Sequence, residues 1–231
     1  MAKESSGVFS TKEAKAARMI FNEGEAQVSD RLYNAIIGGV LLWGFLVNAF
    51  MCTYLVDIFI QWNYIVVIIG YFISCFIGIA MVHKSSNAIV SFIGYNFIVL
   101  PVGVILTILL TQYDPGIVSR AVIATAAVTG VMLLMGTLFP QFFLSLGRIL
   151  MFALIAVIVV ELILVFLFKM DSSFIDWIVV AIFCGYIGYD WSVANQYQKT
   201  VNNAVDSAAD LYLDIINLFI RILSILNRKR R

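Results

Sequence analysis

Two aspartates of this chain lie inside apolar stretches, where a carboxylate is costly. Asp190 ends the run FCGYIGYD, and Asp214 lies within LYLDIINLFIRIL. A charged side chain at the centre of a bilayer costs about 3 kcal/mol on insertion scales, so it normally faces the protein interior or a water-filled cavity. Two such residues near the ends of successive segments predict one shared site, whose occupancy by a proton or a cation matters to function.

Two carboxylates at hydrogen-bond distance resist ionising together, so the pair is expected to hold one shared proton. That proton would draw the two segments together. The ionised pair would instead repel or take up a cation, and calcium prefers oxygen ligands of this kind. Asp190 and Asp214 are therefore the predicted pH sensor and the predicted metal-contacting residues. In the alternative interpretation, each aspartate pairs with a basic residue such as Arg221, Lys84 or Arg148. The aspartates then serve only to fix the register of the helices.

The last apolar stretch also carries a polar stripe. At about 100° per residue, five of its polar side chains fall within about 80° of one another. They are Asp206, Asp210, Asp214, Asn217 and Arg221. Such a helix should be buried in a bundle, with its stripe toward water or polar partners. Asp206 and Asp210 are expected at a solvated entrance, where they are simply hydrated or attract cations. Glu161, a third acid in an apolar run, is expected either to form a hydrogen bond in the bundle or to line the ion path.

The composition is that of an integral membrane protein. Of 231 residues, 62% are hydrophobic and only 13% are charged, and apolar windows long enough to cross a bilayer recur along the chain. The net charge of +1 gives no reason to expect a nucleic-acid partner. His83 is the single histidine, which excludes a multi-histidine metal site, and the three cysteines show no metal-binding spacing. No cofactor is expected; the expected partners are the lipid bilayer, protons and calcium.

Charges and turn formers between the apolar runs predict an all-α fold of seven helices. The helices are expected over residues 33–54, 64–82, 88–110, 120–138, 149–168, 174–191 and 204–226. Pro101 predicts a kink in the third helix, and Pro140 is expected to end the fourth. The chain is divided into a cytoplasmic tail (1–31), a single transmembrane bundle (32–226) and a basic tail (227–231). Basic residues place both ends in the cytoplasm, but seven crossings would separate them, so the orientation of the C-terminus stays open.

Four segments of the sequence resemble the Bax inhibitor-1 family, also called transmembrane Bax inhibitor motif proteins, in its bacterial form. They read ATAAVTGVMLLMG, FLSLGRILMFALIAVIVVELIL, GYIGYD and ADLYLDIINLFIRIL. The resemblance implies six helices around a central C-terminal helix, a paired-aspartate site at Asp190 and Asp214, and a pH-sensitive calcium leak. Lys84 is the nearest candidate for a basic partner that some members carry on the second helix. The sequence departs from the family at Trp191-Ser192, where Thr-Gln is common.

The expected function is thus a calcium leak channel gated by the aspartate pair. The alternative is a non-conducting regulator that binds other membrane proteins, such as a protease or a cell-death factor. Intramembrane aspartyl proteases also carry two aspartates on consecutive helices, but their second one lies in GxGD, where this chain has Leu211 and Leu213. We therefore expect no enzyme. Without a signal peptide or an ER-retrieval ending, the chain is expected in a bacterial inner membrane.

Overall fold

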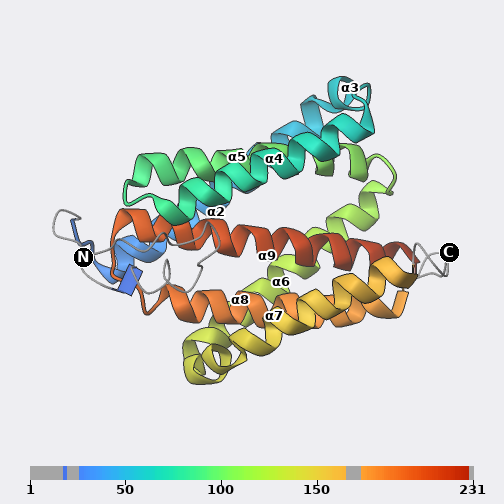
Figure 1. Ribbon diagram of the computed structural model, residues 1–231. Coiled ribbons are helices and arrows are strands. Elements are labelled where there is room, and N and C mark those ends of the chain that lie inside the picture. The colour runs from blue at the N-terminus through green and yellow to red at the C-terminus, as the bar shows by residue number, and fades with distance from the viewer. Residues whose placement is uncertain (1–17, 20–25, 165–172, 229–231) are drawn as a thin grey trace, which may run out of the picture. The chain divides into compact units, whose positions relative to one another are not determined.

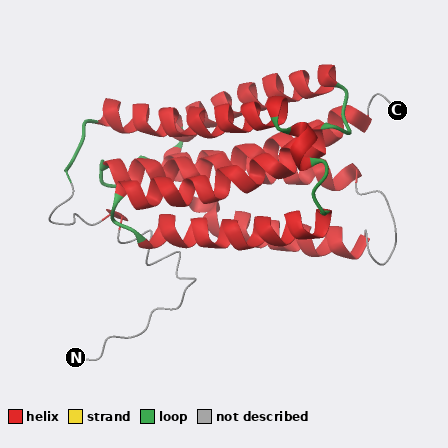
Figure 2. Ribbon diagram, turned by 90° about the horizontal axis from the view of Figure 1, so that it is seen from above, coloured by secondary structure: helices red, strands yellow, loops and turns green. Residues whose placement is uncertain are grey.

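The structure, a computed structural model, describes residues 18–19, 26–164 and 173–228. Within these ranges the regular elements are the helices α2 to α9, joined by short loops (Figures 1 and 2). The expected all-helical class is confirmed. Residues 1–17 and 20–25 of the expected tail, residues 165–168 of the expected fifth helix, and residues 229–231 lie outside the described residues.

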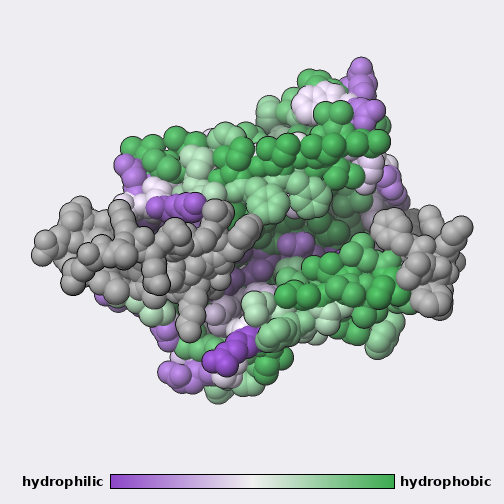
Figure 3. All heavy atoms as spheres, in the orientation of Figure 1, coloured by the Kyte–Doolittle hydropathy of each residue, from purple (hydrophilic) through white to green (hydrophobic). Residues whose placement is uncertain are grey.

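Among the described residues, six helices are long and apolar enough to cross a membrane. They are α2 (Asp30–Tyr54), α4 (Tyr64–Lys84), α5 (Ala88–Leu110), α6 (Pro115–Leu138), α7 (Pro140–Ile163) and α8 (Ser173–Ala194, from Phe174 on). The remaining two are the short α3 (Val56–Phe59) and the long, more polar α9 (Val201–Arg228). Figure 3 shows apolar side chains over much of α4 and α7 on the visible face, as expected of helices that contact lipid.

Two helices begin earlier than the sequence analysis expects. α6 starts at Pro115 rather than residue 120, and α7 starts at Pro140 rather than residue 149. A proline is tolerated at the first helical position, because the N–H that it lacks would have no partner within the helix. The side chain of Asp114 caps α6 by accepting from the N–H of Gly116 at 2.7 Å. Pro140 therefore separates two helices and also starts the second.

One compact unit contains α2 to α5, the connection 196–200 and the first turns of α9. Its helices approach closely at small residues: a Cβ on Gly78 of α4 would lie 2.5 Å from the carbonyl oxygen of Gly94 of α5. α5 also packs against α2, where the Asn48 amide donates to the Val99 carbonyl at 3.0 Å. Helix α5 continues through Pro101.

The other unit contains α6, α7, α8 and α9 from Asp210 onward. α8 packs on both α6 and α7. A Cβ on Gly136 of α6 would lie 2.8 Å from the carbonyl oxygen of Gly188. The Ser192 hydroxyl donates to the Gly136 carbonyl at 3.1 Å and the Trp191 indole to the Thr137 hydroxyl at 2.8 Å. Small side chains and polar bonds thus hold α8, which carries Asp190, in its unit.

Candidate functional site

Helix α9 carries the polar stripe and is mostly buried. All residues from 202 to 209 are buried, and Asp214 is 7% exposed. Asp210 and Arg221 are half-buried, whereas Asn217 is exposed and its amide donates to the Leu213 carbonyl at 2.8 Å. Polar groups removed from water in this way need partners. Each end of the stripe finds them in other segments of the chain.

At its C-terminal end the stripe forms what we call the Arg221 cluster: Glu161, Asp176, Arg221, Ser224 and Arg228. The Arg221 guanidinium donates to both Glu161 oxygens, at 2.7 and 2.8 Å, and also to Asp176 at 2.9 Å. Ser224 donates to the other Asp176 oxygen at 2.9 Å, and an Arg228 nitrogen lies 3.0 Å from that oxygen. Asp176 is 1% exposed. A buried carboxylate is tolerated here because it is both paired and hydrogen-bonded.

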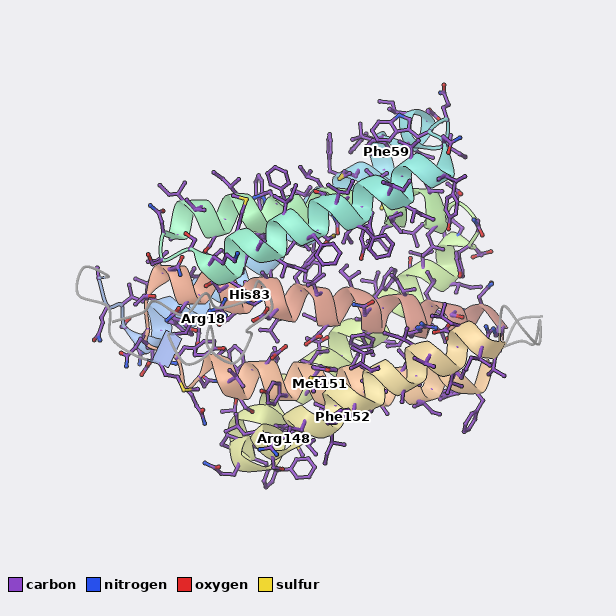
Figure 4. The ribbon with its side chains drawn as sticks, viewed as in Figure 1. Arg18, Phe59, His83, Arg148, Met151 and Phe152 are labelled. Carbon is purple, nitrogen blue, oxygen red and sulfur yellow. The ribbon has the colours of Figure 1, made fainter. Side chains whose placement is uncertain are left out.

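At its N-terminal end the stripe forms the Arg18 cluster: Arg18, His83, Asn202 and Asp206. A nitrogen of Arg18 lies 3.0 Å from an Asp206 oxygen, and the two side chains are 6% and 1% exposed. The same nitrogen lies 3.0 Å from Nδ1 of His83, and both residues are labelled in Figure 4. The Asn202 amide donates to Asp206 at 3.3 Å. A cation from before α2 thus neutralises the first acid of the stripe.

Asp190 and Asp214 lie in the same compact unit, on α8 and α9. Asp176, near the start of α8, contacts Ser224, near the end of α9, while residues 195–200 join the other ends of these helices. The two helices therefore run antiparallel. Asp190 lies about 21 Å along α8 from Asp176, and Asp214 lies about 15 Å back along α9 from Ser224, at 1.5 Å per residue. The two aspartates are thus within about one turn of the same level. A direct contact between their carboxylates stays a prediction.

The other expected site residues are placed as follows. Glu161 pairs with Arg221, which accords with a bonded role in the bundle. Asp206 is buried against Arg18, so it is not at the solvated position expected of it. Lys84 is exposed and is the last residue of α4. The expectation that it pairs with the aspartates stays a prediction.

Sequence reasoning missed Arg18 and Asp176 as site residues. Arg18 lies among mixed charges, where nothing distinguishes it from neighbouring tail residues. Asp176 follows a charged loop and looks like an interfacial residue, yet it is the most heavily bonded acid of the Arg221 cluster. Asp176 could have been noticed in the sequence, because it is the third residue of an apolar run that begins at Phe174. In the described part of the chain, no group of three or more His, Cys, Asp or Glu side chains is arranged to hold a metal ion.

Comparisons with known proteins identify relatives of this chain. A family model described as inhibitor of apoptosis-promoting Bax1 matches residues 25–231. Protein LIFEGUARD 1 of Arabidopsis thaliana is 34% identical over 119 residues, 47% of this chain and 49% of that protein. An uncharacterized membrane protein of Streptococcus pyogenes serotype M3 is 34% identical over 133 residues, 54% of this chain and 58% of that protein. An uncharacterized protein of Deinococcus radiodurans is 27% identical over 146 residues, 60% of this chain and 62% of that protein.

No solved structure matches the chain. The chain spans roughly half to three-fifths of the length of these curated relatives, with shares of 49% to 62%. The family model, in contrast, covers nearly all of the chain, including α8 and α9 with their aspartates. With six apolar helices of membrane-crossing length and a relative named as a membrane protein, the chain is an integral membrane protein and belongs to the Bax inhibitor-1 family.

Proposed function

We propose that this protein is a pH-sensitive calcium leak of the membrane, gated by Asp190 and Asp214. The observation that best supports the proposal is the position of Asp214. It is buried in α9, on the polar stripe of that helix, about two turns before Arg221. A buried ionisable residue at membrane depth is a functional feature by default, because its insertion is costly.

In the proposed closed state the two carboxylates share one proton, which bridges α8 and α9. Loss of the proton leaves two like charges, which separate or take up a cation. Calcium prefers six to eight oxygen ligands, and two carboxylates supply only a few of them. Water would complete the coordination, so the site suits brief occupancy during passage better than tight storage. Flux is therefore expected to rise with pH.

The proposal also includes the seven-helix arrangement that the family implies, with six helices around α9. It assigns no enzymatic activity to the aspartates. Leu211 and Leu213 stand where an intramembrane aspartyl protease has glycines. Each leucine side chain favours continued helix, and α9 is helical throughout Val201–Arg228. A peptide substrate would need unwound backbone at this point, so the helix supports a conducting or regulatory role instead.

The second candidate function is a non-conducting regulator of other membrane proteins. The family description, inhibitor of apoptosis-promoting Bax1, supports it. The two candidates differ in what the isolated protein does. A leak passes calcium with no other protein present, whereas a regulator needs its partner.

The test is calcium flux into liposomes that contain the purified protein, between about pH 6 and about pH 8. The parent should pass more calcium at the higher pH, and Asp214→Asn should lose this dependence because the pair can no longer ionise twice. Asp57→Asn, a matched change at an exposed residue outside the stripe, should behave as the parent. Flux no greater than that of empty liposomes would favour the regulator. An unaltered pH dependence in Asp214→Asn would remove the aspartate pair from the gate.

A further inference from the structure

Two short stretches before α2 are bound to the connection between α8 and α9. The backbone N–H of Gln198 donates to the carbonyl of Arg18 at 3.1 Å, and its side-chain amide donates to the carbonyl of Met19 at 3.2 Å. Further along, the N–H of Val28 donates to the carbonyl of Lys199 at 2.8 Å. The residues on either side of 20–25 are thus attached to the same connection.

The side chain of Arg18 enters the protein at this point. Arg18 is 7% exposed, and its carbonyl accepts from the Asn203 amide at 3.3 Å. The guanidinium lies 5.4 Å from the ring centroid of Tyr197 and makes the ion pair with Asp206. A charge this deeply buried is tolerated only when it is paired, so Asp206 provides much of the reason for Arg18 to stay in place.

The contact between Arg18 and His83 is possible in only one protonation state of the imidazole. An arginine side chain has donors but no acceptor, so in the 3.0 Å contact the Nδ1 of His83 must accept. An imidazole can accept only when it is neutral, with its proton on Nε2. A protonated His83 would place N–H against N–H and a second positive charge beside Arg18. The docked arrangement therefore requires neutral His83.

We propose that Arg18 and Met19 dock onto the start of α9 and the connection before it only while His83 is neutral, so that acidification releases them. Because the docked form holds His83 neutral, docking is favoured at higher pH and is lost as the pH falls and the imidazole takes up a proton. His83 is the only histidine of the chain, and it lies in the last turn of α4, within one residue of the loop that leads to α5.

The charged groups at this end of the unit are few. Arg18 and Asp206 are the partners already described. The other described charged residues here are Lys84, next to His83, and Asp30, Arg31 and Lys199. Lys199 lies over the Tyr33 ring, 4.5 Å from its centroid. Burial lowers the pKa of Lys199, and the nearby Asp30 opposes that effect.

Release would change the environment of Asp206. In the docked state this acid is 1% exposed and paired with Arg18. Without Arg18 it must either gain water or become protonated. The Arg18 side chain is then a pH-dependent cover of the first acid on the polar stripe. The inference goes beyond the proposed leak, because docking can be measured in a protein that passes no ion.

The test uses a fluorine-labelled cysteine at Met19, which is 43% exposed, in the full chain with Cys52, Cys75 and Cys184 replaced by alanine. Fluorine NMR in nanodiscs is recorded from about pH 8 to about pH 5.5. The probe signal should move between two positions as the pH falls across this range. In His83→Gln, which stays neutral and keeps an acceptor oxygen, the high-pH signal should persist throughout.

Two further variants define the released state and the control. Arg18→Gln combined with Asp206→Asn removes both charges without leaving either one buried alone, and it should show the low-pH signal at every pH. Asp57→Asn changes a charge at an exposed position before the opposite end of α4 and should show the same transition as the parent. The inference is overturned if His83→Gln keeps the parent transition, or if the Arg18 double variant keeps the high-pH signal.

Discussion

Arg221 of α9 binds the carboxylate of Glu161 of α7 with two nitrogen–oxygen contacts, of 2.7 and 2.8 Å. This two-point geometry is the strong form of the arginine–carboxylate interaction. The same guanidinium also reaches Asp176 of α8 at 2.9 Å. One cation is therefore shared by two acids from two helices, and it ties the last turns of α9 to both.

Removing Arg221 should destabilise the protein. In Arg221→Gln the nearly inaccessible Asp176 loses a charged partner, and breaking a buried pair in this way costs about 3 kcal/mol. The Arg221 side chain is 26% exposed, so the loss of stability should lie at the lower end of the range of about 3–5 kcal/mol that is usual for buried pairs. Arg221→Lys, which keeps the charge but not the planar fork, should lose less. Thermal unfolding in detergent measures the stability of both variants. Arg120→Gln, a change at an exposed arginine, is the control. Equal unfolding midpoints for the parent and Arg221→Gln would contradict this account.

The two acids of the Arg221 cluster should differ in importance. Asp176 has a 2% exposed side chain with contacts to Arg221, Ser224 and Arg228, whereas the Glu161 side chain is 23% exposed and binds Arg221. Asp176→Asn should therefore lower the free energy of unfolding more than Glu161→Gln does. The difference should be about 1.5–3 kcal/mol, which is the usual contribution of one hydrogen bond to a charged group. Parallel unfolding curves of the two variants decide the order. The reverse order would show that burial of Asp176 does not determine its contribution.

Sequence alone predicted the all-helical class, the membrane location and most helix centres, because long apolar runs have few alternatives. It predicted the polar stripe of α9 from helical geometry. It did not predict which segments would neutralise that stripe. Arg18 pairs with a residue 188 positions later, and Arg221 with one 60 positions earlier; such partners depend on tertiary packing, which periodicity does not encode.

Close packing of α6 on α8 should make Gly136 intolerant of a side chain. A Cβ there would lie 2.8 Å from the carbonyl oxygen of Gly188, which is backbone and cannot easily move. Gly136→Ala should cost about 1–3 kcal/mol, the usual effect of overpacking. Gly130→Ala on the same helix has open space around its Cβ and should be neutral or slightly stabilising. Unfolding midpoints test the pair, and equal effects of the two changes would contradict the packing described.

In the other unit, Tyr33 of α2 is completely buried, and its hydroxyl lies 3.1 Å from the hydroxyl of Ser207 on α9. Tyr33→Phe removes this hydrogen bond and leaves Ser207 in place. The change should lower the free energy of unfolding by about 1 kcal/mol. Tyr64→Phe, the same change at a residue that is 64% exposed, should have little effect. Comparison of the two midpoints separates loss of the hydrogen bond from loss of a surface hydroxyl; a larger effect at Tyr64 would refute the assignment.

The helix starts at Pro115 and Pro140 mark another limit of sequence reading. Pro140 is expected from the sequence to end the fourth helix, yet it begins α7, and Pro115 likewise begins α6. The distinction depends on whether the preceding residue can cap. Asp114 can, and its side chain does so, but Phe139 provides no side-chain cap. The start of α7 therefore could not be predicted from a capping residue in the sequence.

The central claim is that Asp190 and Asp214 share a proton, and its most direct measurement is the separation of their carboxylate oxygens in experimental structures at about pH 6 and about pH 8. We expect a short O–H···O contact of about 2.6 Å at the lower pH and a clearly wider separation, or a bound cation between the oxygens, at the higher one. Two side chains that remain apart at both pH values, each held by its own arginine or lysine, would contradict the claim.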